Sequence, residues 1–315
     1  MSNLDNGTIL CTSSMNNAYN LLTFQDAGQF LSRTQTYLEA HEAINSLMLG
    51  VCLRLARHPE RISDTPYLAS VEKGVLTYLA AMMTPPYNLV LASSQQSIET
   101  ALEMIADDLI AHKWQVPGIS APKKLARTFA ELWAAKTGSR YDLEMAQRIY
   151  ECRAVIPPFG VAGNLRLATS DDIDVVTDWI CAFWEETFPI QHHELEEVMD
   201  LAKTRINDND IYLWDDDLPV SMAARTRPTQ NGISIGFVYT PPQFRNNGYA
   251  TACVAKLTQT LLSSGYKYCA LYTDLANPTS NSIYKKIGYN SVQDVNSYLF
   301  SSASQEEVPT AQLPG

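Results

Sequence analysis

The stretch QFRNNGYATACV, residues 243–254, places a glycine between a strand pattern and the start of a helix. The strand pattern, residues 233–240, ends at two prolines, which cannot continue the hydrogen bonding of a sheet. A helix begins at once, and its N-terminus offers unpaired N–H groups and partial positive charge. Gly248 lets an anion approach the backbone, and the small Ala250 keeps the first turn open. We interpret the stretch as a pyrophosphate-binding turn, although this geometry alone equally fits a plain turn.

Other patterns for nucleotides and metals are weaker. The chain has neither the GxGxxG of dinucleotide-binding folds nor the Gly-Lys-Ser/Thr of a Walker loop. Its six cysteines are scattered without a CxxC pair, and we expect them to be reduced and mostly structural. His192 and His193 are adjacent, so their side chains diverge and no shared metal is expected. The acidic run Asp215, Asp216 and Asp217 is better explained by a solvated turn than by a metal site.

A second stretch, NPTSNSIYKKIGY at residues 277–289, follows the next strand pattern. Together the two stretches resemble the GCN5-related N-acetyltransferase (GNAT) superfamily. The first is similar to its Arg/Gln-x-x-Gly-x-Gly/Ala motif, and the second to its later motif Asn-x-x-Ala-x-x-Leu-Tyr-x-x-x-Gly-Phe. Ser280 stands where alanine is usual and Ile283 where leucine is usual, and both changes are mild. The resemblance covers about residues 161–300.

The resemblance implies acetyl-coenzyme A (acetyl-CoA) as cofactor. It implies that backbone amides of the first motif hold the pyrophosphate, that Asn277 bonds the pantetheine arm, and that Tyr284 lies beside the thioester sulfur. The strand before the turn is expected to splay from the next strand, which leaves backbone groups near Val238 and Tyr239 free for pantetheine. The residues expected to bind the cofactor are Phe237, Val238, Tyr239, Arg245, Asn246, Asn247, Gly248, Tyr249, Ala250, Thr251, Asn277, Ser280 and Tyr284.

The implied reaction is direct attack of an amine on the acetyl carbonyl. Tyr284 is our candidate for protonating the departing thiolate, and packing of its ring on the sheet is the alternative. The base is open among four residues. Glu185, Glu186, Tyr239 and Asp274 are all candidates; the two glutamates also fit a solvated helix face, and Asp274 a cap. Glu185 and Tyr239 join Tyr284 as the predicted catalytic residues.

Two functions remain open from the sequence. The first is an N-acetyltransferase acting on the amine of a small molecule, amino acid or peptide, and the alternative is a non-catalytic CoA-binding sensor or scaffold. Residues 1–160 carry 13 Lys and Arg against 15 Asp and Glu, whereas residues 161–315 carry 10 against 19. The acidic second part argues against nucleic-acid binding and leaves room for a cationic amine. We expect no membrane span, a cytoplasmic location and a possible homodimer.

The expected fold class is α/β (α+β), with a mixed, mostly antiparallel central sheet flanked by helices, in two tandem lobes. We predict a frayed N-terminus at 1–20, an N-terminal lobe at 21–155, a linker at 156–164, a catalytic domain at 165–301 and a flexible tail at 302–315. The two lobes share an order of elements, which indicates a diverged tandem duplication. The first contains YNLVLASSQQSIETAL without any glycine, so we expect that it has lost the cofactor; an unrelated helical module is the alternative.

The periodicity of apolar residues places the individual elements. Helices are predicted as a consecutive pair ending before Pro59, and over 97–114, 121–138, 170–188, 192–208, 249–265 and 279–288. Strands are predicted as hairpins over 67–83 and 210–228, and as single strands over 87–93, 164–169, 232–241, 266–275 and 295–300.

Overall fold

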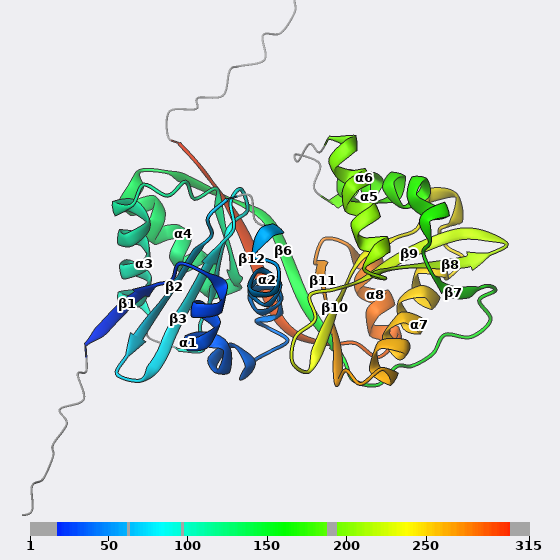
Figure 1. Ribbon diagram of the computed structural model, residues 1–315, viewed down its shortest axis with the longest axis horizontal. Helices are drawn as coiled ribbons and strands as arrows, with labels where there is room; N and C mark the ends of the chain where they lie inside the picture. The colour runs from blue at the N-terminus through cyan, green and yellow to red at the C-terminus, as the bar shows by residue number, and fades with distance from the viewer. Residues whose placement is uncertain (1–17, 62–63, 96–97, 188–193, 303–315) are drawn as a thin grey trace, which may run out of the picture.

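The computed structural model describes residues 18–61, 64–95, 98–187 and 194–302. Within these ranges one twelve-stranded sheet runs through the molecule in the order β1-β2-β3-β4-β5-β12-β6-β11-β10-β9-β8-β7 (Figure 1). The strands are β1 (Tyr19–Thr23), β2 (Tyr67–Lys73), β3 (Leu76–Met83), β4 (Leu89–Ala92), β5 (Gly118–Pro122), β6 (Arg140–Cys152), β7 (Asn164–Leu167), β8 (Ile211–Asp216), β9 (Leu218–Thr226), β10 (Gly232–Tyr239), β11 (Tyr268–Asp274) and β12 (Asn290–Ser301). The helices are α1 (Ala27–Glu39), α2 (Ser46–Arg57), α3 (Glu99–Ala111), α4 (Lys123–Thr137), α5 (Ile173–Thr187), α6 (Leu195–Asn207), α7 (Tyr249–Ser263) and α8 (Pro278–Lys286).

The strand order reads the same from either end of the sheet. From one end it runs β1 to β5 and then β12, and from the other it runs β7 to β11 and then β6. The pairings match too, because β4–β5 and β10–β11 are parallel while the other neighbouring pairs are antiparallel. A helix pair follows the first strand of each half, and single helices follow the fourth and fifth. The predicted fold class and the repeated element order are therefore confirmed.

The last strand of each half lies in the middle of the sheet. β12 lies between β5 and β6, and β6 lies between β12 and β11. The strand next to β5 therefore comes from the second half of the chain (residues 164–302), and the strand next to β11 comes from the first half (residues 18–152). Backbone hydrogen bonds join the two halves along the whole of β6 and β12. The predicted linker, residues 156–164, connects two halves that share one continuous sheet.

Helices cover both faces of the sheet in each half. In the first half α1 and α2 pack on one face and α3 and α4 on the other. In the second half α5 and α6 cover one face, while α7 and α8 cover the other. Figure 1 shows α2 at the centre of the molecule, beside β6 and facing the second half. The faces that carry α2 and α5–α6 thus meet at the junction of the two halves.

Three strands were not predicted from the sequence. β1 begins at Tyr19, so the predicted fraying of residues 1–20 is wrong for 19–20; the rest of that segment lies outside the described residues. β1 is an edge strand with no fully buried side chain, which hides its alternation. β5 has only five residues. β6 is exposed over its first part and buried only near its end. The alternation of apolar and polar residues that is typical of a strand is therefore not visible along it. The predicted tail, apart from Ser302, also lies outside the described residues.

Candidate functional site

The two strands beside the predicted turn separate as expected. β10 and β11 pair in parallel only from Gly232–Tyr268 to Ser234–Ala270. Beyond this point β10 follows β9 alone, and a bulge between Gly236 and Tyr239 shifts its register. Phe237 lies in that bulge with a φ of +50°, a backbone conformation that few residues other than glycine adopt. The half of β10 nearest the turn therefore presents backbone groups that β11 does not pair.

The turn leads directly into an open helix N-terminus. Gly248 is the residue before α7 and has a φ of +84°, and Asn246 has a φ of +66°. A Cβ at position 248 would lie 3.1 Å from a methyl carbon of Val161, so conformation and space both favour glycine. No side chain caps α7, and its first turn holds no acidic residue. The N–H groups of the first turn, at Tyr249, Ala250 and Thr251, are those that an α-helix leaves without intrahelical partners.

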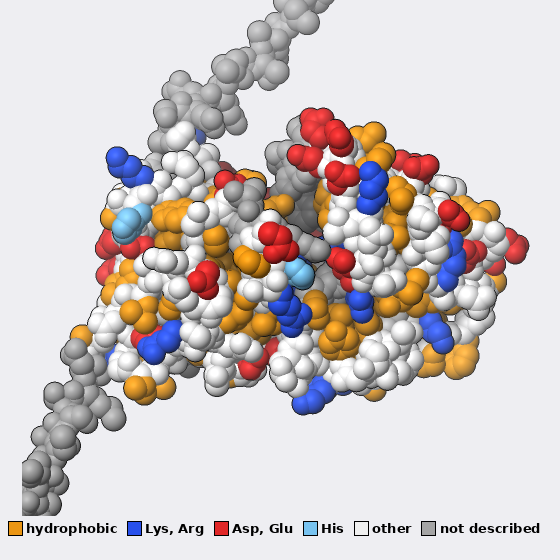
Figure 2. All heavy atoms as spheres, in the orientation of Figure 1, with side chains coloured by type: hydrophobic (Ala, Val, Ile, Leu, Met, Phe, Trp, Pro, Cys, Tyr) orange, Lys and Arg blue, Asp and Glu red, His pale blue; other side chains and the backbone are white. Residues whose placement is uncertain are grey.

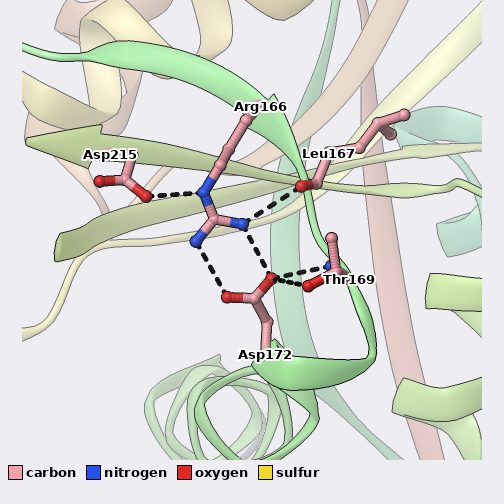
Figure 3. Close-up of polar contacts among 5 residues, drawn as sticks. All are labelled: Arg166, Leu167, Thr169, Asp172 and Asp215. Carbon is pink, nitrogen blue, oxygen red and sulfur yellow. Dashed lines mark hydrogen bonds and ion pairs between the residues drawn. The ribbon is translucent and has the colours of Figure 1, made fainter.

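A charged network joins β7, the end of β8 and the residues before α5 (Figure 3). Arg166 on β7 donates to both oxygens of Asp172, at 2.8 and 2.9 Å, and to Asp215 at 2.6 Å. Asp172 also accepts from the backbone N–H of Thr169 and so caps the start of α5. Because hydrogen bonds from Arg166 stabilise its ionised form, the pKa of Asp172 lies below its usual value.

The next aspartate connects the hairpin to α7. The Tyr249 hydroxyl donates to Asp216 at 2.6 Å, and this hydrogen bond raises the pKa of Tyr249. The acidic run is thus not merely a solvated turn, because Asp215 binds Arg166 and Asp216 binds the first residue of α7. No group of three metal-ligating residues occurs among the described residues.

Arg245 and Asn247 make contacts within the turn and with α5. The Arg245 guanidinium donates to the Thr240 carbonyl at 2.8 Å and to Glu186 at 2.6 Å, and it lies 5.8 Å from the Tyr239 ring centre. The side-chain amide of Asn247 donates to the carbonyls of Phe244 and Arg245. Arg245 therefore joins the turn to the end of α5, where both predicted glutamates are exposed.

The aromatic side chains of β10 point to the face covered by α5. The Tyr239 ring is buried and lies 6.2 Å from Trp179, and Phe237 lies 5.5 Å from Phe183. Burial raises the pKa of Tyr239, and Glu186 adds to this effect, so the phenol stays protonated at neutral pH. Val238 packs on the opposite face against the core of α7 and α8. The raised pKa of Tyr239 thus favours a role as proton donor over a role as base.

The second motif forms the start of α8. The Asn277 side chain accepts from the backbone N–H of Ser280 at 3.0 Å and caps the helix. Asp274 accepts from the backbone N–H of Ala276 at 2.8 Å, which is the capping role considered for it. Asn281 donates to the carbonyls of Asp274 and Asn277 and fixes this turn.

Tyr284 lies inside the core between α8 and the sheet. It is 6% exposed, and its ring centre is 6.4 Å from Tyr150 and 6.0 Å from Tyr289. Burial raises its pKa to about 12, opposed by a side-chain hydrogen bond with Ser280. The ring packs as the alternative prediction expected, and the hydroxyl keeps its proton at neutral pH, as a general acid requires.

Comparison with known proteins supports the architecture. Residues 216–299 match the family described as FR47-like protein. A GNAT-family acetyltransferase structure from Colwellia psychrerythraea aligns with 90% of this chain and 100% of its own, with 11% identity and a TM-score of 0.55. The chain has the GNAT fold. A GCN5-related N-acetyltransferase structure from Sphaerobacter thermophilus gives a TM-score of 0.58 at 12% identity, over 89% of this chain and 94% of its own.

The duplicated GNAT architecture also has a solved counterpart. A tandem GNAT protein from the clavulanic acid biosynthesis pathway aligns with 92% of this chain and 100% of its own, with 10% identity and a TM-score of 0.55. No curated protein matches the chain in sequence. At these identities the likeness concerns the fold. Over the parts that the structure describes, no helix has both the length and the apolar character of a membrane span.

Sequence reasoning missed two features of the site. The Glu186–Arg245 ion pair joins residues 59 positions apart, and no local pattern marks it. The contact from Tyr249 to Asp216 spans 33 positions in the same way. The acidic run after a strand pattern is the signal in the sequence that points to Asp216.

Proposed function

We propose that this chain is an N-acetyltransferase that transfers the acetyl group of acetyl-CoA to the amine of a small molecule or peptide by direct attack in a ternary complex. The observation that carries the proposal is the uncapped N-terminus of α7, preceded by Gly248 and placed beside the separated strands β10 and β11. A pyrophosphate fits the first feature and an extended pantetheine arm fits the second. The GNAT fold of the whole chain supports this assignment.

The residues of the turn fit the cofactor chemically. Backbone amides from Asn246 to Thr251 would hold the pyrophosphate, and no carboxylate in the first turn of α7 opposes it. The backbone of β10 from Phe237 to Tyr239, which β11 does not pair, would hydrogen-bond the pantetheine arm and orient the thioester carbonyl. When bound, acetyl-CoA supplies an acetyl group activated as a thioester. The Asn277 side-chain amide and Ser280 lie at the start of α8, on the other side of the strand separation.

Tyr284 is the proposed proton donor to the leaving thiolate. Its raised pKa of about 12 is above that of an ordinary thiol. A phenol with this pKa is protonated at neutral pH and therefore has a proton to donate.

Glu185 is the proposed base among the four candidates. Glu186 is paired with Arg245, Asp274 accepts from the backbone, and the pKa of Tyr239 is raised. Glu185 is exposed at the end of α5 and makes no hydrogen bond with the described residues. An exposed carboxylate there can pass the amine proton to water.

The proposal is tested by measuring free thiol release from acetyl-CoA over a panel of amines, with calorimetric titration of CoA in parallel. We expect CoA binding and amine-dependent thiol release. Binding without release against every amine would favour the CoA-binding sensor or scaffold. Absence of binding would refute the cofactor site itself.

A further inference from the structure

Four arginines gather where α2 of the first half meets α6 and β9 of the second half. Arg205 lies in the last turn of α6, Arg225 lies on β9, Arg227 follows β9, and Arg54 lies on α2. Arg54 and Arg227 are electrostatic neighbours of Arg205 and of each other. Figure 2 shows Lys and Arg side chains at the junction of the halves, over α2, below a notch in the molecular outline. Three of these arginines belong to the more acidic half of the chain, and Arg54 belongs to the other half.

One acidic residue beside the cluster, Asp210, pairs with two of its arginines. Asp210 accepts from Arg225 at 3.0 Å and lies 3.5 Å from Arg205, and the backbone carbonyl of Asp208 also accepts from Arg225. The Nε atoms of Arg205 and Arg227 are buried without a partner among the described residues. Burial lowers the pKa of both guanidiniums, and in each case Arg54 adds to the effect. Asp210 offsets part of the charge of the cluster, and a further anion beside Arg227 and Arg54 would offset the rest.

The cluster adjoins the separated strands where the reaction is proposed. The Arg205 guanidinium lies 5.0 Å from the ring centre of Phe237, the bulge residue of β10. The Arg227 guanidinium lies 5.5 Å from the ring centre of Tyr272 on β11. Ser234 on β10 is fully buried, and its hydroxyl has no partner in the described structure. Unpartnered donors thus line the α5–α6 face of β10, the face opposite α7 and α8.

Gly50 holds the first half against this face. A Cβ added to Gly50 would overlap the Arg227 Cβ and lie 3.0 Å from its Cα, so only glycine allows this approach of α2. Two further contacts fix the junction. Glu42 accepts from the backbone and side-chain amides of Asn231 at 2.8 Å, and the Tyr272 hydroxyl lies 3.5 Å from the Ile44 carbonyl. The first half therefore places Arg54 beside Arg227.

We propose that the acetyl acceptor carries a carboxylate, bound at the junction by Arg205, Arg227 and Arg54, so that the acceptor is an amino acid or a peptide with a nearby carboxyl group. A planar carboxylate matches the paired donors of a guanidinium and completes the charge of the cluster. The ammonium end of such an acceptor lies toward Phe237 and the exposed glutamates of α5. This inference rests on the proposed acetyl transfer.

The test compares amino acids with their carboxamides as acceptors, scored by thiol release from acetyl-CoA. We expect kcat/KM to be at least about 10-fold higher for the acids, since a charge-assisted hydrogen bond confers a preference of that order. Arg227→Met should remove the preference while leaving the affinity for CoA unchanged. Arg54 is exposed, so Arg54→Met keeps the fold and should raise KM for the acids without changing kcat for the amides. Arg57→Met, also exposed on α2, is the matched control and should change neither.

The outcomes separate this inference from the proposed function. Thiol release that is equal for acids and amides, or higher for an aminoalkyl phosphate, overturns the carboxylate and leaves the transferase intact. If no amine releases thiol, calorimetry with N-acetyl amino acids and N-acetyl carboxamides in the presence of CoA decides. Binding that needs the carboxylate and is lost in Arg227→Met supports the site, and absence of binding overturns it.

Discussion

The helix that follows the fourth strand begins differently in the two halves. In the second half, α7 starts after Gly248 without a capping side chain and without an acidic residue in its first turn. In the first half, α3 starts with Glu99, whose carboxylate accepts from the backbone N–H of Ile98 at 2.9 Å. A carboxylate there satisfies the helix N-terminus and repels a phosphate. The N-terminus of this helix is therefore uncapped in the second half and carries a carboxylate in the first half.

β4 and β5 also pair at only two positions, but other side chains fill the space beside them. In the first half, the space next to β4 and β5 is lined by Val90 and Ser120, by the start of α2, and by Tyr272 and Val295 from the second half. The cavity left there is only about 20 Å³, which holds one or two water molecules. We therefore propose that the first half binds no cofactor and that its α2 forms one wall of the acceptor site. In this proposal, the second half binds the cofactor and the first half supports the acceptor.

Removal of β12 is expected to have the largest effect, because it separates the halves. A chain ending at Tyr289 lacks the strand that pairs with β5 and β6, so we expect both halves to lose cooperative unfolding. A chain ending at Ser302 keeps every described strand and should unfold as the full chain does. Circular dichroism during thermal unfolding measures this. A truncated chain whose second half still unfolds cooperatively would mean that the halves are independent.

The contrast between α7 and α3 is tested by adding a carboxylate to each. Ala250→Glu puts a negative charge in the first turn of α7, and we expect affinity for CoA to fall by roughly 100-fold through like-charge repulsion. The same substitution favours the helix dipole, so stability should not fall. Thr100→Glu, at the exposed equivalent position of α3, is the control and should leave CoA affinity unchanged. Equal calorimetric affinities for all three proteins would place the pyrophosphate elsewhere.

Substitution of Tyr284 tests whether this residue has the catalytic role that we propose for it. Tyr284→Phe should lower kcat by about 100-fold while CoA affinity changes little, because the hydroxyl acts only on the leaving thiolate. Tyr289→Phe is a neighbouring control that removes a hydroxyl bonded to Thr258 at 2.8 Å. It should cost about 1 kcal/mol of stability and leave kcat near wild type. Equal turnover in Tyr284→Phe would leave this ring with a packing role alone.

The two edges of the sheet should respond differently to acid. At β1, Tyr19 packs on Tyr78 at 5.2 Å and Lys73 lies 4.9 Å from the Tyr19 ring. At β7 the edge depends on Arg166, Asp172 and Asp215. Since the pKa of Asp172 is lowered on folding, its contribution is present above the unfolded pKa of about 3.9 and is lost as pH falls through the lower folded pKa.

Asp172→Asn tests that difference. We expect it to cost about 1–3 kcal/mol at pH 7 and less at pH 3, where the wild type has begun to lose the same interaction. Urea denaturation at the two pH values measures the cost. A cost that is constant across this range would show that the ionised carboxylate does not stabilise the β7 edge.

The sequence predicted what local chemistry determines. The glycine turn before α7, the short helix α8 and the hairpins each depend on neighbouring residues, and the expected elements are present there. The exposed first part of β6 and the short β5 lacked a readable period. The arginine cluster was invisible because Arg54, Arg205 and Arg227 become neighbours only when α2 packs on the second half. Contacts between distant segments follow from the fold, and a single sequence does not mark them.

The central position of β12 sets the order of events during synthesis. The ribosome completes all strands of the first half long before residues 290–301 emerge, yet the place beside β5 belongs to these last residues. Until then one edge of β5 is unpaired. If β6 paired with this edge, it would take the place of β12. Pairing across such sequence distances is slow, and open strand edges attract other chains. We therefore expect that a chaperone which shields the edge of β5 during synthesis raises the yield of folded chains.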